Sequence, residues 1–152
     1  MSGFVDGEGC FNVSLEKKEK FKLGIEIRVS FSVSQGQSSR DLIEKISFFF
    51  NTCTETKNIR PDRKTDKYET RKLEHILSEV IPHFDKYPLE SNKQNDFLKF
   101  KEVCFLMKQK KHLIKTDLER IIEIAYTMNL DNDLLTRRRS TKESWLTLLA
   151  NK

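Results

Sequence analysis

The chain has 152 residues, of which 34% are charged and 37% hydrophobic, a balance that is typical of a folded, soluble protein and excludes a disordered one. It has no run of about 18 apolar residues and no apolar leader at its start, so we expect no membrane-spanning helix, no membrane partner and no signal peptide. Lys and Arg number 28 against 23 Asp and Glu, and the net charge of +5 weakly favours a polyanionic partner.

Two segments near the N-terminus alternate between apolar and polar residues, which is typical of strands. The first covers residues 10–16 and the second residues 21–33, with a polar loop at 17–20 between them. At about 3.3 Å per residue the second strand would be about 40 Å long, comparable to one turn of B-DNA at about 34 Å. The pattern predicts a long β-hairpin with one apolar and one polar face.

Apolar residues at helical spacing predict a series of helices after this hairpin. Pro82 should end the second helix, and Ser91 with Gln94 and Thr116 with Glu119 resemble capping boxes that start later ones. The predicted helices cover residues 41–50, 72–81, 91–110, about 116–128 and a short stretch around 145–149.

A second, weaker hairpin is predicted between the first two of these helices. Its strands would cover residues 54–60 and 67–72, with a basic loop at 61–66. Apolar residues are few in this region, so Ile59 and Tyr68 are the expected anchors.

The cysteines and histidines show no metal-binding spacing. Cys10, Cys53 and Cys104 are scattered, form no CxxC pair and are odd in number, so we expect buried thiols in a reducing compartment rather than a disulfide framework or a zinc ribbon. The three histidines, His75, His83 and His112, are equally dispersed.

The most specific pattern is Gly-Phe-Val-Asp-Gly-Glu-Gly, which begins at Gly3. Gly3 and Gly7 share one face of a helix and would let a second backbone approach closely. Gly9 suits the left-handed conformation that ends many helices. The helix would present Glu8 at its C-terminal end, while Asp6 is expected to be an ordinary capping or surface acid.

This segment resembles the second half of the LAGLIDADG motif of homing endonucleases. The order helix, hairpin, helix, hairpin, helices matches the αββαββα order of that family. Ser30–Gln35, Phe84–Leu89 and Lys111–Leu113 are also similar to family segments, and the resemblance runs from Gly3 to about Met128.

The resemblance implies a mixed α+β fold, with a saddle-shaped, four-stranded antiparallel sheet and helices on one face. We expect one domain over residues 1–152, with a core at about 3–129 and a helical extension at about 130–152. One motif implies a homodimer that pairs through the motif helix on a near-palindromic DNA site, with half of a longer two-motif enzyme as the open alternative. Met1 and Ser2 stand where the family has Leu-Ala, so the motif helix should be short or the sequence should begin inside it.

The resemblance further implies an intron-encoded, site-specific endonuclease that cuts double-stranded DNA with Mg²⁺, and with Mn²⁺ or Ca²⁺ as alternative occupants of the site. Cleavage would leave 3′-hydroxyl ends. Glu8, Gln35 and Lys93 would be catalytic, and Glu8 with the Gly7 carbonyl would bind metal. Polar side chains of the hairpins would contact DNA: Asn12, Ser14, Glu26, Arg28, Ser30, Ser32, Asn58, Arg60, Lys67, Glu69 and Arg71.

Several alternatives remain open from the sequence. Gln35 could be a turn residue before Gly36, Lys93 a surface lysine, and Arg137–Arg139 either a phosphate grip or a solvated linker. The chain could be a maturase that binds intron RNA, or a DNA-binding protein that does not cleave. The family occurs in organelles, phages, archaea and bacteria, so a mitochondrion or chloroplast is allowed but not fixed.

Overall fold

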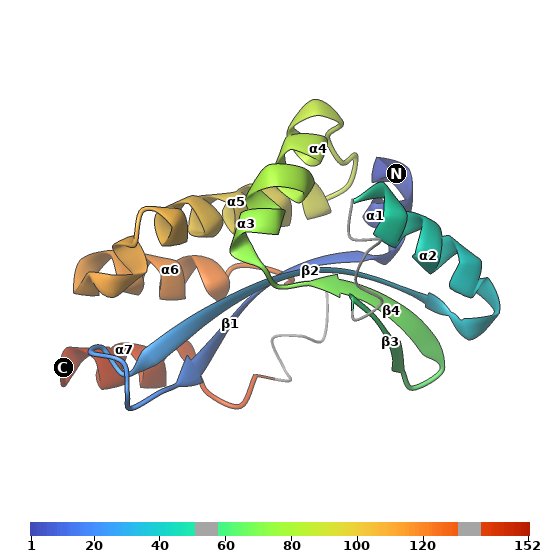
Figure 1. Cartoon of the computed structure of the whole chain (residues 1–152). Coiled ribbons are helices and arrows are strands. Elements are labelled where there is room, and N and C mark those ends of the chain that lie inside the picture. The colour runs from blue at the N-terminus through green and yellow to red at the C-terminus, as the bar shows by residue number, and fades with distance from the viewer. Residues whose placement is uncertain (51–57, 131–137) are drawn as a thin grey trace. The chain divides into compact units, whose positions relative to one another are not determined.

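A computed structural model describes residues 1–50, 58–130 and 138–152. Its four strands form one sheet in the order β1-β2-β4-β3, and β4 pairs antiparallel with both β2 and β3. None of the described helices is long and apolar enough to cross a membrane. The elements, in chain order, are α1 (Ser2–Glu8), β1 (Gly9–Lys17), β2 (Ile25–Gly36), η1 (Gln37–Ser39), α2 (Arg40–Phe49), β3 (Ile59–Asp62), β4 (Thr65–Thr70), α3 (Leu73–His75), η3 (Ile76–Val80), α4 (Ile81–Lys86), α5 (Lys93–Lys108), η4 (Lys111–Leu113), α6 (Lys115–Ala125) and α7 (Lys142–Ala150) (Figure 1).

This order of elements confirms the predicted α+β class and the αββαββα succession. The chain divides into two compact units, residues 1–11 with 30–94, and residues 12–29 with 95–152. Both strands of the first hairpin therefore contribute to both units. The saddle shape and the single domain with a C-terminal extension stay predictions.

An aromatic cluster forms the core of the first unit. Phe31 of β2 stacks on Phe11 with 5.2 Å between ring centroids and contacts Phe50 and Phe84 edge-on at 5.3 and 5.7 Å. These rings and that of Tyr68 are at most 1% exposed. Within this unit α2 and α4 lie on the same side of β2 and β4 (Figure 1). Tyr68 is the predicted anchor, whereas Ile59 is only half-buried.

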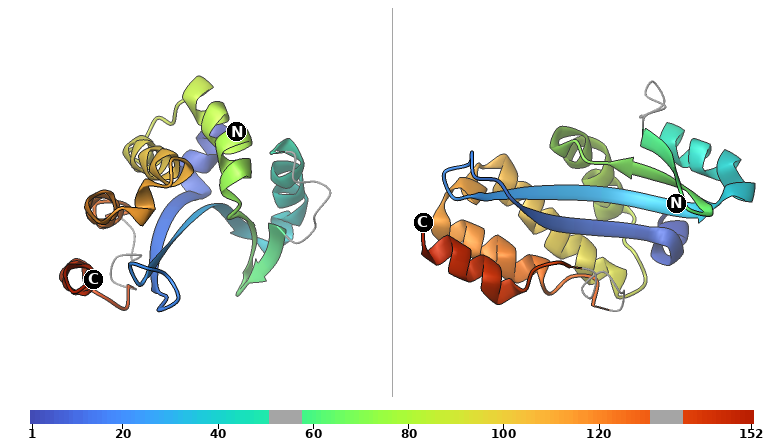
Figure 2. Two further views of the ribbon diagram at one scale, coloured as in Figure 1. Left: turned by 60° about the vertical axis from the view of Figure 1, so that its left-hand side comes forward. Right: turned by 90° about the horizontal axis from the view of Figure 1, so that it is seen from below.

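The second unit packs α5, α6 and α7 around a core that is mainly aliphatic. α7 lies along α6 (Figure 2), and its N-cap Thr141 accepts a hydrogen bond from the Ser144 amide. Burial raises the pKa of the Cys104 thiol to about 12, as predicted for a buried cysteine, while Cys10 is half-buried and Cys53 lies outside the described residues. The buried residues include Val13, Val29, Phe100, Val103, Leu118, Ile121, Ile122, Ala125, Trp145 and Leu149.

The long strand begins four residues later than its alternation predicts. Between the strands, the Lys18 amide donates to the Gly24 carbonyl at 2.9 Å and the Phe21 amide to the Lys18 carbonyl at 3.0 Å, so residues 18–24 form a compact turn. Gly24 has a φ of 70°, a conformation that glycine adopts without a steric penalty. β2 then continues through Gln35 to Gly36.

The loop predicted at residues 61–66 is wrong. β3 and β4 are joined by the two-residue turn Arg63-Lys64, and Arg63 has a φ of 59°. Thr65 reinforces the turn because its hydroxyl donates to the Asp62 carbonyl at 2.7 Å. The first part of the predicted strand, residues 54–57, lies outside the described residues.

Two helix boundaries also differ from the prediction. Pro82 does not end a helix. The π-helical turn η3 precedes it, and the proline lies in the first turn of α4, where a backbone N–H would make no hydrogen bond within the helix. Thr116 lies inside α6 rather than at its N-cap, which is Ile114 and makes no side-chain cap.

Candidate functional site

The motif helix α1 ends at Glu8, whose side chain is exposed. Within the described residues, no hydrogen bond or ion pair holds its carboxylate. The predicted left-handed conformation of Gly9 is wrong, since its φ and ψ are −83° and 157°. Glycine is required there for space, because a Cβ would lie 2.3 Å from Val5 Cγ1 and 2.7 Å from the Val5 carbonyl oxygen. The chain thus leaves the helix in tight contact with its last turn.

Lys93, the first residue of α5, holds the end of the motif helix. Its Nζ donates to the Val5 carbonyl at 3.1 Å and to the Gly9 carbonyl at 2.7 Å. A cation at this end satisfies carbonyl groups and complements the helix dipole. Lys93 is half-buried, and these two carbonyls engage its ammonium group, so it is not a free surface lysine.

Asp6 makes a second connection between α1 and the start of α5. Its carboxylate accepts from the Glu90 amide at 2.7 Å, the Ser91 amide at 3.1 Å and the Ser91 hydroxyl at 2.6 Å. Partial burial raises the pKa of Asp6, but these hydrogen bonds and the charge of Lys93 outweigh it, so the pKa falls below its usual value. Asp6 thus caps no helix and instead holds the segment before α5, a role that the sequence interpretation did not include.

This contact explains why the predicted capping box of Ser91 and Gln94 is only half right. The Ser91 hydroxyl does accept from the Lys93 amide at 3.2 Å. The Ser91 amide, however, already donates to Asp6, so the Gln94 side chain accepts from the Leu89 amide at 3.0 Å instead.

Gln35 lies inside β2, so its interpretation as a turn residue is wrong. It is opposite Asp66 of β4, and its side-chain oxygen accepts from the Gly36 amide at 3.0 Å. The structure records no hydrogen bond among the side chains of Glu8, Lys93 and Gln35.

The end of α1 offers oxygen ligands that suit a hard divalent cation: the free Glu8 carboxylate and the neighbouring Gly7 carbonyl. The described residues contain no group of three or more His, Cys, Asp or Glu side chains that could hold a metal. A Cβ added at Gly3 or Gly7 would meet nothing within 4 Å, so this face of the helix is open to a second backbone.

In the first unit, the face of β3 and β4 opposite the aromatic core carries the predicted DNA-binding cations. Arg71, Arg60 and Lys67 surround Glu69, with nitrogen–oxygen distances of 2.9, 3.4 and 3.5 Å. Ser32 lies opposite Glu69 on β2.

Two serines of this face are less accessible than the alternating pattern predicts. Ser30 and Ser32 are only 9% and 5% exposed, since their side chains are short and β2 is an inner strand of the sheet. Asn58, just before β3, is half-buried.

In the second unit, Arg28 is held between two carboxylates. Its Nη1 lies 2.6 Å from Glu16 and its Nη2 3.0 Å from Glu26. Glu16 was not among the predicted site residues, although its place on the polar side of the 10–16 alternation could have indicated it. Asn12 and Ser14 are half-buried on β1.

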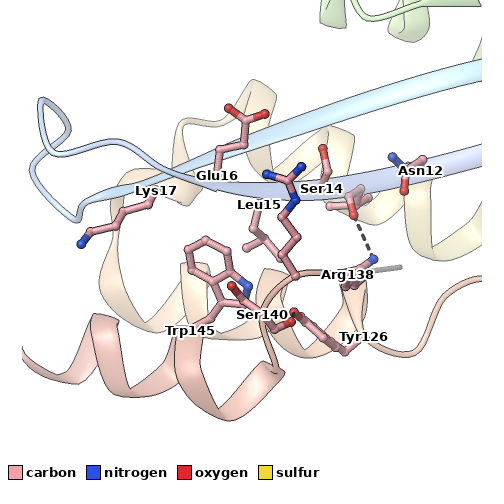
Figure 3. A pocket seen from close by; sticks show the side chains of 11 residues that line it. Asn12, Ser14, Leu15, Glu16, Lys17, Tyr126, Arg138, Ser140 and Trp145 are labelled. Atoms are coloured by element: carbon pink, nitrogen blue, oxygen red, sulfur yellow. Dashed lines mark hydrogen bonds between the residues drawn. The ribbon is translucent and has the colours of Figure 1, made fainter. Parts of the chain in front are cut away.

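Asn12 and Ser14 also line a pocket of about 810 Å³ with Tyr126, Arg138 and Trp145 (Figure 3). Arg138 donates to the Val13 carbonyl at 3.0 Å and the Ala125 carbonyl at 2.8 Å. Its guanidinium also lies 4.5 Å from the centre of the Tyr126 ring.

The arginines of the basic run at 137–139 therefore differ in their contacts. Arg138 holds this segment in place, because its Nη2 donates to two backbone carbonyls. Arg139 is exposed and has no partner among the described residues. Arg137 lies outside them.

The comparison with known proteins agrees with this arrangement. A family profile described as LAGLIDADG endonuclease matches residues 1–104. The chain belongs to the LAGLIDADG endonuclease family.

Curated relatives of this LAGLIDADG chain are considerably longer. It is 30% identical over 129 residues to "Probable intron-encoded endonuclease 2" of Neurospora crassa, covering 85% of the chain and 28% of the relative. It is 26% identical to "Probable intron-encoded DNA endonuclease 1" of Mycosarcoma maydis, covering 100% of the chain and 52% of the relative. The chain thus spans between about a quarter and a half of these relatives.

The chain matches one solved structure of this kind over nearly its whole length and others over less than half of theirs. The homing endonuclease I-TnaI matches with a TM-score of 0.81 and 30% identity, over 96% of this chain and 92% of that one. I-SmaMI bound to cleaved DNA matches with a TM-score of 0.82 and 29% identity, over 99% of this chain but 46% of that one. I-CpaMI, solved bound to uncleaved DNA, is 30% identical and is covered over 43%.

Proposed function

We propose that this protein is a metal-dependent, site-specific endonuclease that hydrolyses phosphodiester bonds in both strands of double-stranded DNA. The observation that carries the proposal is the free Glu8 carboxylate at the end of a motif helix that Lys93 and Asp6 hold in place. Relatives named as endonucleases and structural neighbours bound to DNA support it.

Glu8 and the Gly7 carbonyl would hold the cation, for which we propose Mg²⁺, with Mn²⁺ or Ca²⁺ as alternatives. A bound divalent cation would polarise the scissile phosphate and activate a water. A neighbour, I-SmaMI, was solved on uncleaved DNA in the presence of calcium ions, which supports an oxygen-liganded cation.

Two other side chains of the chain have proposed roles in the reaction. Lys93 places a positive charge at the end of the motif helix that carries Glu8, and it would stabilise negative charge that develops at the phosphate. Gln35, whose amide nitrogen is a hydrogen-bond donor, would orient the attacking water.

We propose that the site is completed by a second motif helix in a homodimer. Each chain supplies one Glu8, and the open Gly3 and Gly7 face allows a second helix to approach closely. The match to 92% of I-TnaI supports a single-motif subunit. The match to less than half of I-SmaMI fits a chain equivalent to one half of a longer enzyme.

DNA would be read by the polar faces of the two hairpins, because a β-ribbon fits the major groove. The near-palindromic site would follow from the two-fold symmetry of the dimer. The proposed contacts are Asn12, Ser14, Glu26, Arg28, Ser30, Ser32, Asn58, Arg60, Lys67, Glu69 and Arg71.

A curated relative is named for ND4 intron 1, which supports an intron-encoded protein and an organelle as its compartment.

The test is selection from a library of random DNA duplexes, comparing wild type with Glu8→Gln. Wild type should cut a subset of the library only when Mg²⁺ is present. The amide keeps the shape of the side chain and loses the charge that a divalent cation requires, so the variant should bind the same sequences without cutting them.

The matched control is Glu74→Gln, since Glu74 is an exposed glutamate of α3 that has no hydrogen bond or ion pair with the residues that the structure describes. It should cut like wild type. If Glu8→Gln cuts as fast as wild type, the metal site is wrong. If wild type binds structured intron RNA and cuts no duplex, the protein is a maturase instead.

A further inference from the structure

Glu69 is the most enclosed member of its charge cluster in the first unit. Its side chain is 10% exposed, against 61% for Arg71, 48% for Arg60 and 19% for Lys67. The carboxylate therefore lies at the centre of the cluster, and the two arginines extend from it toward solvent.

Strand pairing fixes this arrangement. Lys67 and Glu69 are two residues apart on β4 and share a face, and Arg60 of β3 lies directly opposite Lys67. Tyr68, between them, faces the aromatic core and is fully buried. The cluster consequently occupies the polar face that the proposed function assigns to DNA.

The chemistry of the cluster favours an indirect role for Glu69. A carboxylate only accepts hydrogen bonds, and this one already faces three cationic donors, so little of its capacity remains for a base edge. Each guanidinium has five N–H donors, of which the contact with Glu69 occupies few. The arginines can therefore bind DNA while the carboxylate holds them.

The same contacts limit the freedom of the cations. Three long basic side chains on one face would repel one another and occupy many rotamers if the central negative charge were absent. Glu69 lowers the local charge from +3 to +2 and restricts the rotamers in advance. Such preorganisation favours selective over non-selective contacts.

We infer that Glu69 is a specificity-determining positioning residue, which directs Arg60, Lys67 and Arg71 toward a short block of base pairs and lowers affinity for DNA of other sequence. The inference rests on the proposed function, and it replaces the direct DNA contact proposed there for Glu69 with an indirect role. A similar arrangement of carboxylates that hold a cation occurs in the second unit, where Glu16 and Glu26 lie 2.6 and 3.0 Å from Arg28.

The test is Glu69→Gln in the same random-duplex selection. Preference should fall about ten-fold at one contiguous block of each half-site, the loss expected when one base contact is misdirected. Affinity for a single random-sequence duplex should rise, because the released cations are free to contact phosphates and the salt dependence steepens. A variant that merely damaged the sheet would lose both kinds of binding.

Glu123→Gln is the matched control. It removes the same charge from an ion pair of 3.1 Å with Lys142 that lies outside this face, and it should leave the selected sequences unchanged. Arg60→Gln provides a second approach that does not depend on the folding of the Glu69 variant, and it should weaken preference within the same block.

The outcomes separate the two claims. Selection by Glu69→Gln at wild-type stringency, or weaker binding of the variant to random DNA, would overturn the inference and leave the endonuclease proposal intact. A wild-type protein that selects no sequence would overturn both.

Discussion

Gly9 makes the tightest backbone approach in the motif, and this contact leads to a stability prediction. In Gly9→Ala the new Cβ would overlap Val5 Cγ1 and crowd the Val5 carbonyl at 2.3 and 2.7 Å. The helix end must then shift, and we expect the free energy of unfolding to fall by about 1–3 kcal/mol. Urea denaturation of the purified chain would measure this.

Gly7→Ala is the control for this variant. A Cβ there would meet nothing within 4 Å, and alanine favours a helix over glycine by about 1 kcal/mol. Gly7→Ala should therefore be at least as stable as wild type. Equal stability of Gly9→Ala and wild type would show that the close approach does not restrict this position.

Asp6 should contribute to stability in a pH-dependent way. Its pKa is lowered in the folded chain, so the unfolded chain binds the proton more readily as the pH falls. The contribution is complete above the unfolded pKa of about 4 and is lost as the pH falls through the folded value. The difference in unfolding free energy between wild type and Asp6→Asn should shrink below about pH 4. A difference that stays constant with pH would contradict this.

At this scale, the motif was sufficient to predict where Glu8 lies but not what surrounds it. Glycine at position 9 permits both a positive φ and a close approach, and residue type alone does not distinguish them. The contacts of Lys93 with Val5 and Gly9 join residues more than 80 positions apart. Such a contact follows from packing, which leaves no local pattern in the sequence.

Among the elements, strands and helices with strong periodicity were predicted well, and their ends were not. The alternation at 21–33 continues through Phe21 and Leu23, although those residues form the turn that Gly24 closes. Alternation indicates which residues face the core, whereas the hydrogen bonds of a turn decide where pairing stops. Pro82 led to a wrong helix end because a proline is also tolerated in the first turn of a helix, and here the π-helical turn η3 ends just before α4 begins.

The segment before α7 leads to a prediction about how it is held on β1. Arg138→Met would leave the Val13 and Ala125 carbonyls without their donor and remove the contact with Tyr126. We expect the free energy of unfolding to fall by about 1–2 kcal/mol, since a charged donor is lost at a partly exposed site. Chemical denaturation would measure the change.

Arg139→Met is the matched control, one residue along the same segment. Its side chain is exposed and has no partner among the residues that the structure describes, so stability should change by less than about 0.5 kcal/mol. If Arg139 contacts a phosphate, the slope of log affinity against log salt should become shallower by about 0.9. Equal destabilisation by the two variants would contradict the distinction between them.

For the whole molecule, the open face of the motif helix predicts association. Gly7→Leu would add a bulky side chain where the chain itself has nothing within 4 Å. The variant should fold with near wild-type stability, yet it should dimerise at least ten-fold more weakly and lose DNA cleavage in parallel, because the two helices are kept apart. Sedimentation and cleavage measured on the same samples would test the link. A variant that dimerises normally would contradict it.

The central claim is that two motif helices assemble one cleavage site on DNA. Its most direct test is the mass of the complex between wild type and a selected duplex. Sedimentation would measure that mass in Ca²⁺, which should slow cleavage. The account predicts two chains on each duplex, and a Gly7→Leu sample that does not reach this mass. One chain on each duplex, at every protein concentration, would contradict the account, whether or not that complex cuts DNA once Mg²⁺ is added.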